Sequence, residues 1–347
     1  MDGERGATAL GFAAAIVVLG VVFWIVGIDK TVQALRSASL PIALLVVPVA
    51  VCWLTMWGMA LHTVLRALDA PVSAPRAVLV FVSAMFANNV TPFGQAGGEP
   101  LSALLISESA DTEYETGLAA IASVDALHFV PSIGLATLGL GYIAVQTVTL
   151  GRNLLLAAGA VAVLATAVPL AAFLGWRYRY ELEAAVVRVL TPVIRGVGSL
   201  VPGREPIEPA VIERRIEGFF EAIDRVAASR RTIITALGFS LAGWISLASA
   251  LWVAAYAVGV TVPFAAVIIV VPIGSIAGVT PLPGGLGGIE AAFAALLVAT
   301  TGIAGSTAFA AVFIHRAATY WLSTITGGGI AAAIWTRRSQ KRRANSE

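Results

Sequence analysis

Charged residues are scarce in this sequence. Only 12% of its 347 residues are charged, against roughly 25% in an ordinary soluble domain, and 58% are hydrophobic. The deficit is too large for a soluble protein with a big core, and the mean hydropathy of +0.89 agrees with that exclusion. The sequence therefore predicts an all-α, multi-pass protein of the cytoplasmic membrane.

Reactive and metal-binding residues are also few. The single cysteine, Cys52, excludes an internal disulfide and a cysteine-based zinc site. The three histidines, His62, His128 and His315, lack the spacing of metal ligands. The chain has no P-loop, no Ser-His-Asp order and no basic–aromatic surface for nucleic acid. We expect neither metal nor cofactor, no nucleic-acid partner and, in the leading interpretation, no enzymatic activity.

Apolar runs occupy most of the chain instead. Crossing a hydrocarbon core of about 30 Å takes about 20 helical residues. Two shorter runs end in Gly/Pro-rich breaks, and each is followed by a second apolar helix: Pro75–Val90 with Pro100–Ser107, and Pro263–Val279 with Gly285–Thr300. Six runs are long enough to be full spans: Ala7–Ile28, Pro41–Leu65, Gly117–Val145, Asn153–Trp176, Thr232–Val258 and Ser306–Trp335.

The distribution of positive charge indicates how the broken segments cross. Each is either a re-entrant hairpin or one broken helix. The linker Arg177–Arg231 carries ten arginines, and the tail after Trp335 carries five basic residues. Only hairpins place both in the cytoplasm with the N-terminus, as the positive-inside rule favours. This topology puts 18 of the 22 basic residues on the cytoplasmic side and leaves Lys30, Arg36 and Arg152 outside.

The two broken motifs resemble each other. The first reads VTPFGQAGGEPLSALLI and the second VTPLPGGLGGIEAAFAALL. An ionisable group follows the glutamate by 26 residues in both, as Asp125 after Glu99 and Arg316 after Glu290. Each half then reads span, span, hairpin, span, and this odd number of crossings inverts one half relative to the other. Such inverted repeats are typical of transporters whose site lies at the repeat interface near the midplane.

This organisation predicts three regions. Residues 1–145 form a first transmembrane repeat, residues 146–335 form a second that contains the cytoplasmic linker 177–231, and residues 336–347 form a basic cytoplasmic tail. Within the linker, Pro206–Ser229 carries an apolar stripe with helical spacing. That stripe fits a helix on the inner membrane surface or a helix that docks a partner.

The two glycine-rich loops, Thr91–Gly98 and Thr280–Gly288, are candidate ligand sites. Non-helical backbone at membrane depth must be buried in protein or line a watery cavity. Glycine allows a ligand to approach the backbone, and the helix after each break points unpaired N–H groups at its loop. That geometry suits a phosphate, although the glycines are also explained by tight turns and close packing.

Ionisable residues inside spans are expensive and are functional by default. Glu99 and Glu290 either satisfy helix N–H groups or hold an amine or a proton. Arg316 either binds phosphate in bidentate fashion or is the counterion of Glu290 or Asp125. Asp125 and His128 share one helical face and form a proton relay with His315 unless the histidines are simply satisfied core residues.

Asn88 and Asn89 either cap the helix before the first break or offer amides to a headgroup. The complete candidate binding set is Asn88, Asn89, Thr91, Gln95, Gly97, Gly98, Glu99, Asp125, His128, Thr280, Pro283, Gly284, Gly285, Gly287, Glu290, Arg316 and Tyr320.

These motifs resemble the transmembrane region of lysylphosphatidylglycerol synthases and the stand-alone flippase-like proteins related to it. The matching segments are Asn88–Pro100, Thr280–Phe293 and His315–Trp321, and the similarity follows the order of spans along nearly the whole chain. Family members commonly have an arginine where this chain has Ser102, and a Glu-Arg pair where it has Asp125 and Ala126.

The resemblance implies lipid translocation without synthase activity, since no soluble transferase domain follows the spans. We expect a flippase-like transporter that moves a phospholipid or a polyprenyl-phosphate-linked lipid between leaflets through a midplane headgroup site. A transporter of a small polar solute is one alternative. A lipid-modifying membrane enzyme that uses Glu99 and Asp125 as acid and base is another. Whether copies of the chain associate is left open.

Overall fold

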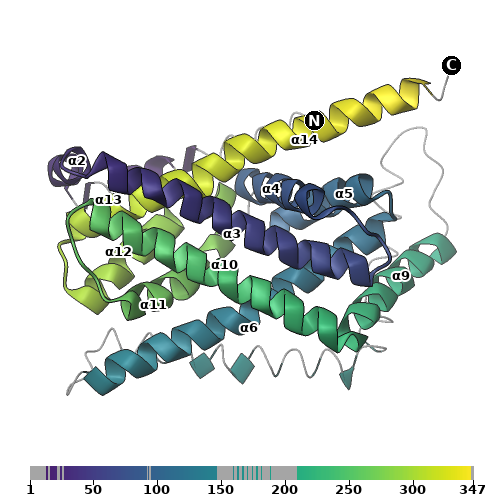
Figure 1. Ribbon diagram of the computed structural model, residues 1–347, viewed down its shortest axis with the longest axis horizontal. Helices are drawn as coiled ribbons and strands as arrows, with labels where there is room; N and C mark the ends of the chain where they lie inside the picture. The colour runs from purple at the N-terminus through teal and green to yellow at the C-terminus, as the bar shows by residue number, and fades with distance from the viewer. Residues whose placement is uncertain are drawn as a thin grey trace.

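The computed structural model describes residues 27–91, 93, 95–146 and 209–344, with scattered residues within 13–25 and 159–188. Over this part the chain is helical and contains no strand, as its composition predicts (Figure 1). The predicted spans Ala7–Ile28 and Asn153–Trp176 lie largely outside the described residues. So do most of the linker before Pro209 and the side chains of the basic tail.

Two long antiparallel helices form the centre of the molecule. Helix α3 (Leu40–Ala67) packs along α10 (Arg230–Ala257), and the N–H of Ser39 donates to the carbonyl of Ala257 at 2.8 Å. The start of α3 therefore meets the end of α10. Small buried alanines on both helices, among them Ala50 and Ala254, allow this close approach. Both spans begin and end within two residues of their predicted bounds.

Each broken motif folds as a pair of neighbouring helices. Helices α4 (Ala74–Val90) and α5 (Gln95–Ala110) lie side by side towards one end of the long axis. Helices α11 (Phe264–Ser275) and α12 (Gly288–Thr301) lie side by side towards the other end (Figure 1). The short turns η1 (Ile276–Val279) and η2 (Pro283–Gly285) connect the second pair.

The first broken motif corrects one predicted boundary. Helix α5 begins at Gln95, more than a turn before the predicted start at Pro100. The prediction took the proline as the first helical residue, whereas the structure accommodates it inside the helix. Gly97 and Gly98 consequently lie in the first turn of α5 rather than in the loop, and Glu99 follows them in the same helix.

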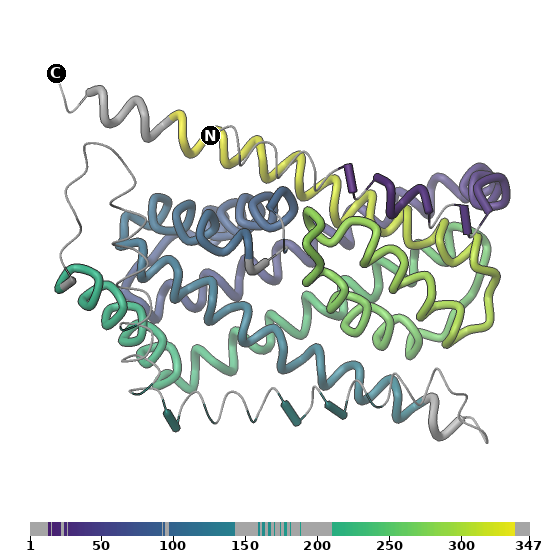
Figure 2. Tube along the Cα trace, turned by 180° about the vertical axis from the view of Figure 1, so that it is seen from behind, coloured from purple at the N-terminus to yellow at the C-terminus, as the bar shows by residue number. Residues whose placement is uncertain are grey.

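The helix that follows each broken motif packs against a helix of the other motif. Helix α6 (Tyr114–Gln146) leaves α5 and packs against α11. The final helical stretch consists of α13 (Gly305–Arg316), the π-helical turn η3 (Ala317–Trp321) and α14 (Leu322–Ala344). It leaves α12, and α14 packs against α4 (Figures 1 and 2).

Two amphipathic helices flank this bundle. Helix α2 (Ile28–Arg36) contacts α13, and α9 (Pro209–Ala228) contacts α6 at the far end of the molecule. The predicted linker helix is confirmed. Its apolar stripe faces the bundle, because Ile212 is 3% exposed, and Arg215 forms an ion pair with Glu115 of α6 at 3.0 Å.

Four helical segments among the described residues are long and apolar enough to cross a membrane. They are Leu40–Ala67, Tyr114–Tyr142, Arg230–Ala257 and Pro283–Thr301. The first three match predicted spans, and the fourth contains the second arm of the second motif. The predicted last span is helical throughout but is interrupted by the π-helical turn, which divides it into a short helix and a less apolar one. Two shorter apolar helices, Ala74–Val90 and Phe264–Val279, match the first arms.

Candidate functional site

The loop of the second motif packs against the end of α4 from the first. Gly284 adopts φ +54°, a left-handed conformation that favours glycine. A Cβ at this position would overlap the ring of Tyr320 and lie 3.0 Å from Cα of Asn89. The absence of a side chain therefore lets three segments meet at one point: the end of α4, the turn η2 and the π-helical turn.

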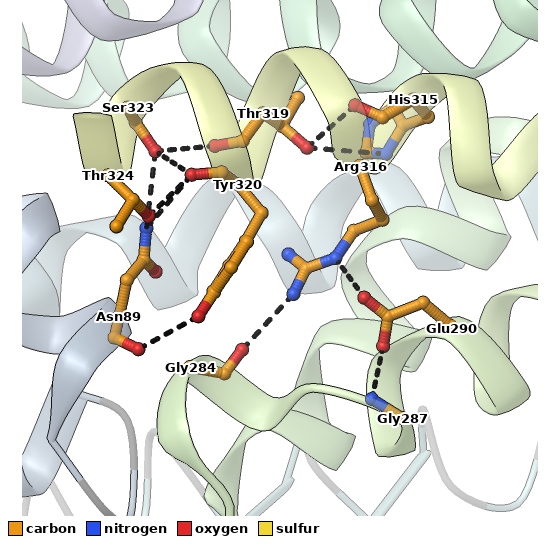
Figure 3. Close-up of polar contacts among 10 residues, drawn as sticks. All are labelled: Asn89, Gly284, Gly287, Glu290, His315, Arg316, Thr319, Tyr320, Ser323 and Thr324. Atoms are coloured by element: carbon orange, nitrogen blue, oxygen red, sulfur yellow. Dashed lines mark hydrogen bonds and ion pairs between the residues drawn. The ribbon is translucent and has the colours of Figure 1, made fainter. Parts of the chain in front are cut away.

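Glu290 fastens the start of α12. Its Oε2 accepts a hydrogen bond from the N–H of Gly287 at 2.6 Å, and its Oε1 accepts one from Nε of Arg316 at 2.6 Å (Figure 3). The first bond satisfies a helix N–H group, and the second neutralises a carboxylate that is only 3% exposed. Of the counterions predicted for Arg316, the structure shows Glu290.

Arg316 is held on three sides. Besides Glu290 it donates through Nη2 to the carbonyl of Gly284 at 3.2 Å. Its guanidinium lies over the ring of Tyr320, 4.8 Å from the centroid, in a cation–π contact. Among the described residues Nη1 has no hydrogen-bond partner (Figure 3). One donor of the fork is thus available to a ligand while the other contacts fix its direction.

Tyr320 and Asn89 connect the π-helical turn to the end of α4. The hydroxyl of Tyr320 donates to the carbonyl of Asn89 at 3.1 Å. The Nδ2 of Asn89 donates to Thr324 at 2.8 Å and to Ser323 at 3.2 Å (Figure 3). Sequence reasoning missed Ser323 and Thr324, although polar residues three and four positions after Tyr320 mark a polar face on an apolar helix.

The π-helical turn lies between these contacts. It begins directly after Arg316 and contains Tyr320. An extra residue in a helical turn changes the direction of the side chains around it, and such turns are frequent at functional sites. Here the turn allows Arg316 to reach Glu290 and Tyr320 to reach Asn89.

The first motif brings a second group of predicted residues together. Asn88, 4% exposed, lies against Gly98, since a Cβ on this glycine would lie 2.6 Å from Cα of Asn88. Neither end of the Asn88 amide has a hydrogen-bond partner among the described residues. Thr91 donates from its hydroxyl to the carbonyl of Ala87 at 2.7 Å and so closes the end of α4. Glu99 follows Gly98 and is partly buried.

Asp125 and His128 occupy neighbouring turns of α6. Asp125 is 8% exposed and lies near enough to Glu99 for their charges to repel each other. His128 bonds through Nδ1 to the hydroxyl of Ser240 at 2.7 Å and stacks on Trp57 with centroids 4.0 Å apart. His128 is therefore packed into the α3–α6–α10 interface, but it is only partly satisfied, because its buried Nε2 has no hydrogen-bond partner among the described residues. No contact among the described residues joins it to His315.

The remaining candidates are divided between loop and helix. Pro283 and Gly285 are buried in η2, and the hydroxyl of Thr280 has no partner among the described residues. Gly97 is partly buried in the first turn of α5, and the side chain of Gln95 lies outside the described residues.

The helical bundle and its long apolar helices define a multi-pass membrane protein. The sequence profile of the lysylphosphatidylglycerol synthase TM region matches residues 9–327, and the chain belongs to that family. It is 28% identical over 338 residues to a UPF0104 membrane protein of Methanothermobacter thermautotrophicus, covering 96% of this chain and 94% of the relative. A UPF0104 membrane protein of Pyrococcus horikoshii is 22% identical over 315 residues, covering 89% and 91% respectively.

Proposed function

We propose that the protein is a flippase-like transporter, not an enzyme, that moves a lipid with a phosphate-bearing headgroup between leaflets. The single observation that carries the proposal is the meeting of two broken motifs around a partly buried arginine, Arg316. Arg316 donates a hydrogen bond to Gly284 in the second loop. Tyr320 donates one to Asn89 at the end of α4, just before the first loop. A headgroup bound there would contact both halves, as alternating access requires.

The inverted repeat is part of this proposal. The antiparallel α3 and α10 are equivalent in the two halves, and the exchange of α6 and α14 between hairpins is reciprocal. A twofold axis in the membrane plane accounts for both features. It also makes each hairpin re-entrant from its own side, with the two loops near mid-bilayer.

The distribution of charge supports the proposed orientation. Arg66 lies in the last turn of α3, Arg76 lies near the start of α4, and α10 begins at Arg230. These helix ends lie towards the end of the molecule that holds α9 (Figures 1 and 2). Helix α2, with Lys30 and Arg36, lies at the opposite end. The positive-inside rule assigns the first end, with the linker and the C-terminus, to the cytoplasm.

Apolar exposure at the loops favours a lipid over a small polar solute. Phe93 in the first loop is 54% exposed, and Val279 before the second is 73% exposed. Large apolar side chains beside a charged site suit an amphiphile whose tails remain in the bilayer. A transporter of a small polar solute would instead hold its ligand in a watery cavity that is closed to lipid.

Leaflet exchange in liposomes tests the function. Purified protein is reconstituted with a fluorescent phospholipid or with a fluorescent lipid that has an uncharged sugar headgroup. We expect protein-dependent exchange of the phospholipid alone. Arg316→Lys should lose most of it, because lysine keeps the charge but lacks the planar fork.

Arg230→Lys, at an exposed position, makes the same chemical change away from the site and should exchange lipid like the wild type. Wild-type exchange by folded Arg316→Lys would exclude phosphate recognition by this residue. No protein-dependent exchange of either lipid would reject the proposed function.

A further inference from the structure

The two halves of the site carry different charge at equivalent positions. In the second half Arg316 follows Glu290 by 26 residues and lies 2.6 Å from it. Asp125, a second acid, follows Glu99 by the same 26 residues in the sequence. One half is therefore internally neutralised, and the other combines two carboxylic side chains.

The glutamates of the two motifs, Glu99 and Glu290, differ in whether their carboxylates have partners among the described residues. Both oxygens of Glu290 are occupied, one by the N–H of Gly287 and one by Arg316. Within the described ranges Glu99 has neither a hydrogen bond nor an ion pair. It is also less buried than Glu290, so a ligand can reach it.

Asn88 provides an independent indication of a ligand. Its amide is buried and unpartnered among the described residues, which ordinarily costs free energy. A Cβ on Gly98 would overlap its Oδ1, so the amide lies against the helical turn that carries Glu99. A bound group at this place would satisfy both side chains.

The backbone also contributes negative charge close to Asn88. Helix α4 ends at Val90, directly after Asn88 and Asn89, and its last carbonyls give this end a partial negative charge. Unwound helix ends of this kind coordinate cations in transporters with broken helices.

We propose that Asn88, Glu99 and Asp125 bind one monovalent cation through their oxygen atoms. The three side chains supply fewer oxygen atoms than the six to eight that Ca²⁺ takes. The cation is either free Na⁺ or the ammonium group of a lipid headgroup. The role in transport rests on the proposed function, whereas binding itself does not.

Thermal unfolding of the purified chain in detergent tests this binding without any transport. One series replaces choline chloride with NaCl at constant total salt, and a second replaces it with ethanolamine hydrochloride. We expect the midpoint to rise and saturate with one of the two small cations. Glu99→Gln should need roughly tenfold more cation for the same shift, because a charged ligand has been lost.

Glu113→Gln removes an exposed acid outside the group and should respond like the wild type. Asp125→Asn serves as the second site variant if Glu99→Gln does not fold. Saturation by Na⁺ identifies a free ion, and saturation by ethanolamine alone identifies a headgroup ammonium. An equal response in Glu99→Gln, no response to either cation, or a dependence on pH alone would overturn the proposal. Cation binding without lipid exchange would reject the transport function and leave the cation site standing.

Discussion

The side chain of Arg316 makes structural contacts that do not require a ligand. It neutralises Glu290, which is almost inaccessible to solvent, and it holds the carbonyl of Gly284. Removing one partner of a buried pair leaves an uncompensated charge, which is far more costly than removing both. The contribution of the ion pair to folding stability can therefore be measured separately from its contribution to transport.

We expect Arg316→Ala to destabilise the protein by about 3–5 kcal/mol, because it strands the carboxylate of Glu290. The double variant Arg316→Met with Glu290→Gln should recover most of this loss, since no buried charge remains. Unfolding in mild detergent measures both, with the Arg230→Ala variant as the exposed control. A single variant as stable as the control would show that the pair contributes nothing to the fold.

The turn η2 decides how closely the second loop can pack against the end of α4. Its residue Gly284 combines a left-handed backbone with close approach to Tyr320 and Asn89. Both requirements exclude a side chain at this position, because it would be strained and would also push η2 away from Tyr320 and Asn89. The turn is thus the part of the second motif least able to accept a substitution.

Gly284→Ala should cost about 1–3 kcal/mol in unfolding free energy and abolish lipid exchange. Gly329→Ala is the matched control, since this glycine lies in α14 and a Cβ added to it would have no atom within 4 Å. It should instead stabilise the helix by up to ~1 kcal/mol. Equal stability and exchange in the two variants would contradict the proposed role of the turn.

At the scale of the whole molecule, the proposed topology places the linker and the C-terminus in the cytoplasm. In a Cys52→Ser background, a membrane-impermeant thiol reagent added to intact cells should fail to label Arg204→Cys and Ser339→Cys. Lys30→Cys, on the opposite side, should react. Efficient labelling of Arg204→Cys or Ser339→Cys from outside would refute the hairpin topology.

Much of the architecture was predictable from local patterns. Apolar length alone located α3, α6 and α10, because a span must satisfy its own backbone and bury apolar side chains whatever its neighbours are. Glycine and proline marked both breaks, and the membership of the family followed from the motifs around them. The start of α5 was misplaced because a proline near a helix start fits both the first helical position and a later one.

The sequence by itself determined the membrane class, the broken motifs and the family, since all three depend on composition and short-range spacing. Only the tertiary structure decided the partners. It paired Arg316 with Glu290 rather than Asp125, placed His128 against Trp57 and Ser240, and brought Asn89 to Ser323 and Thr324. These contacts join residues far apart in the chain. Their geometry depends on helix crossing and on the π-helical turn, which no local pattern specifies.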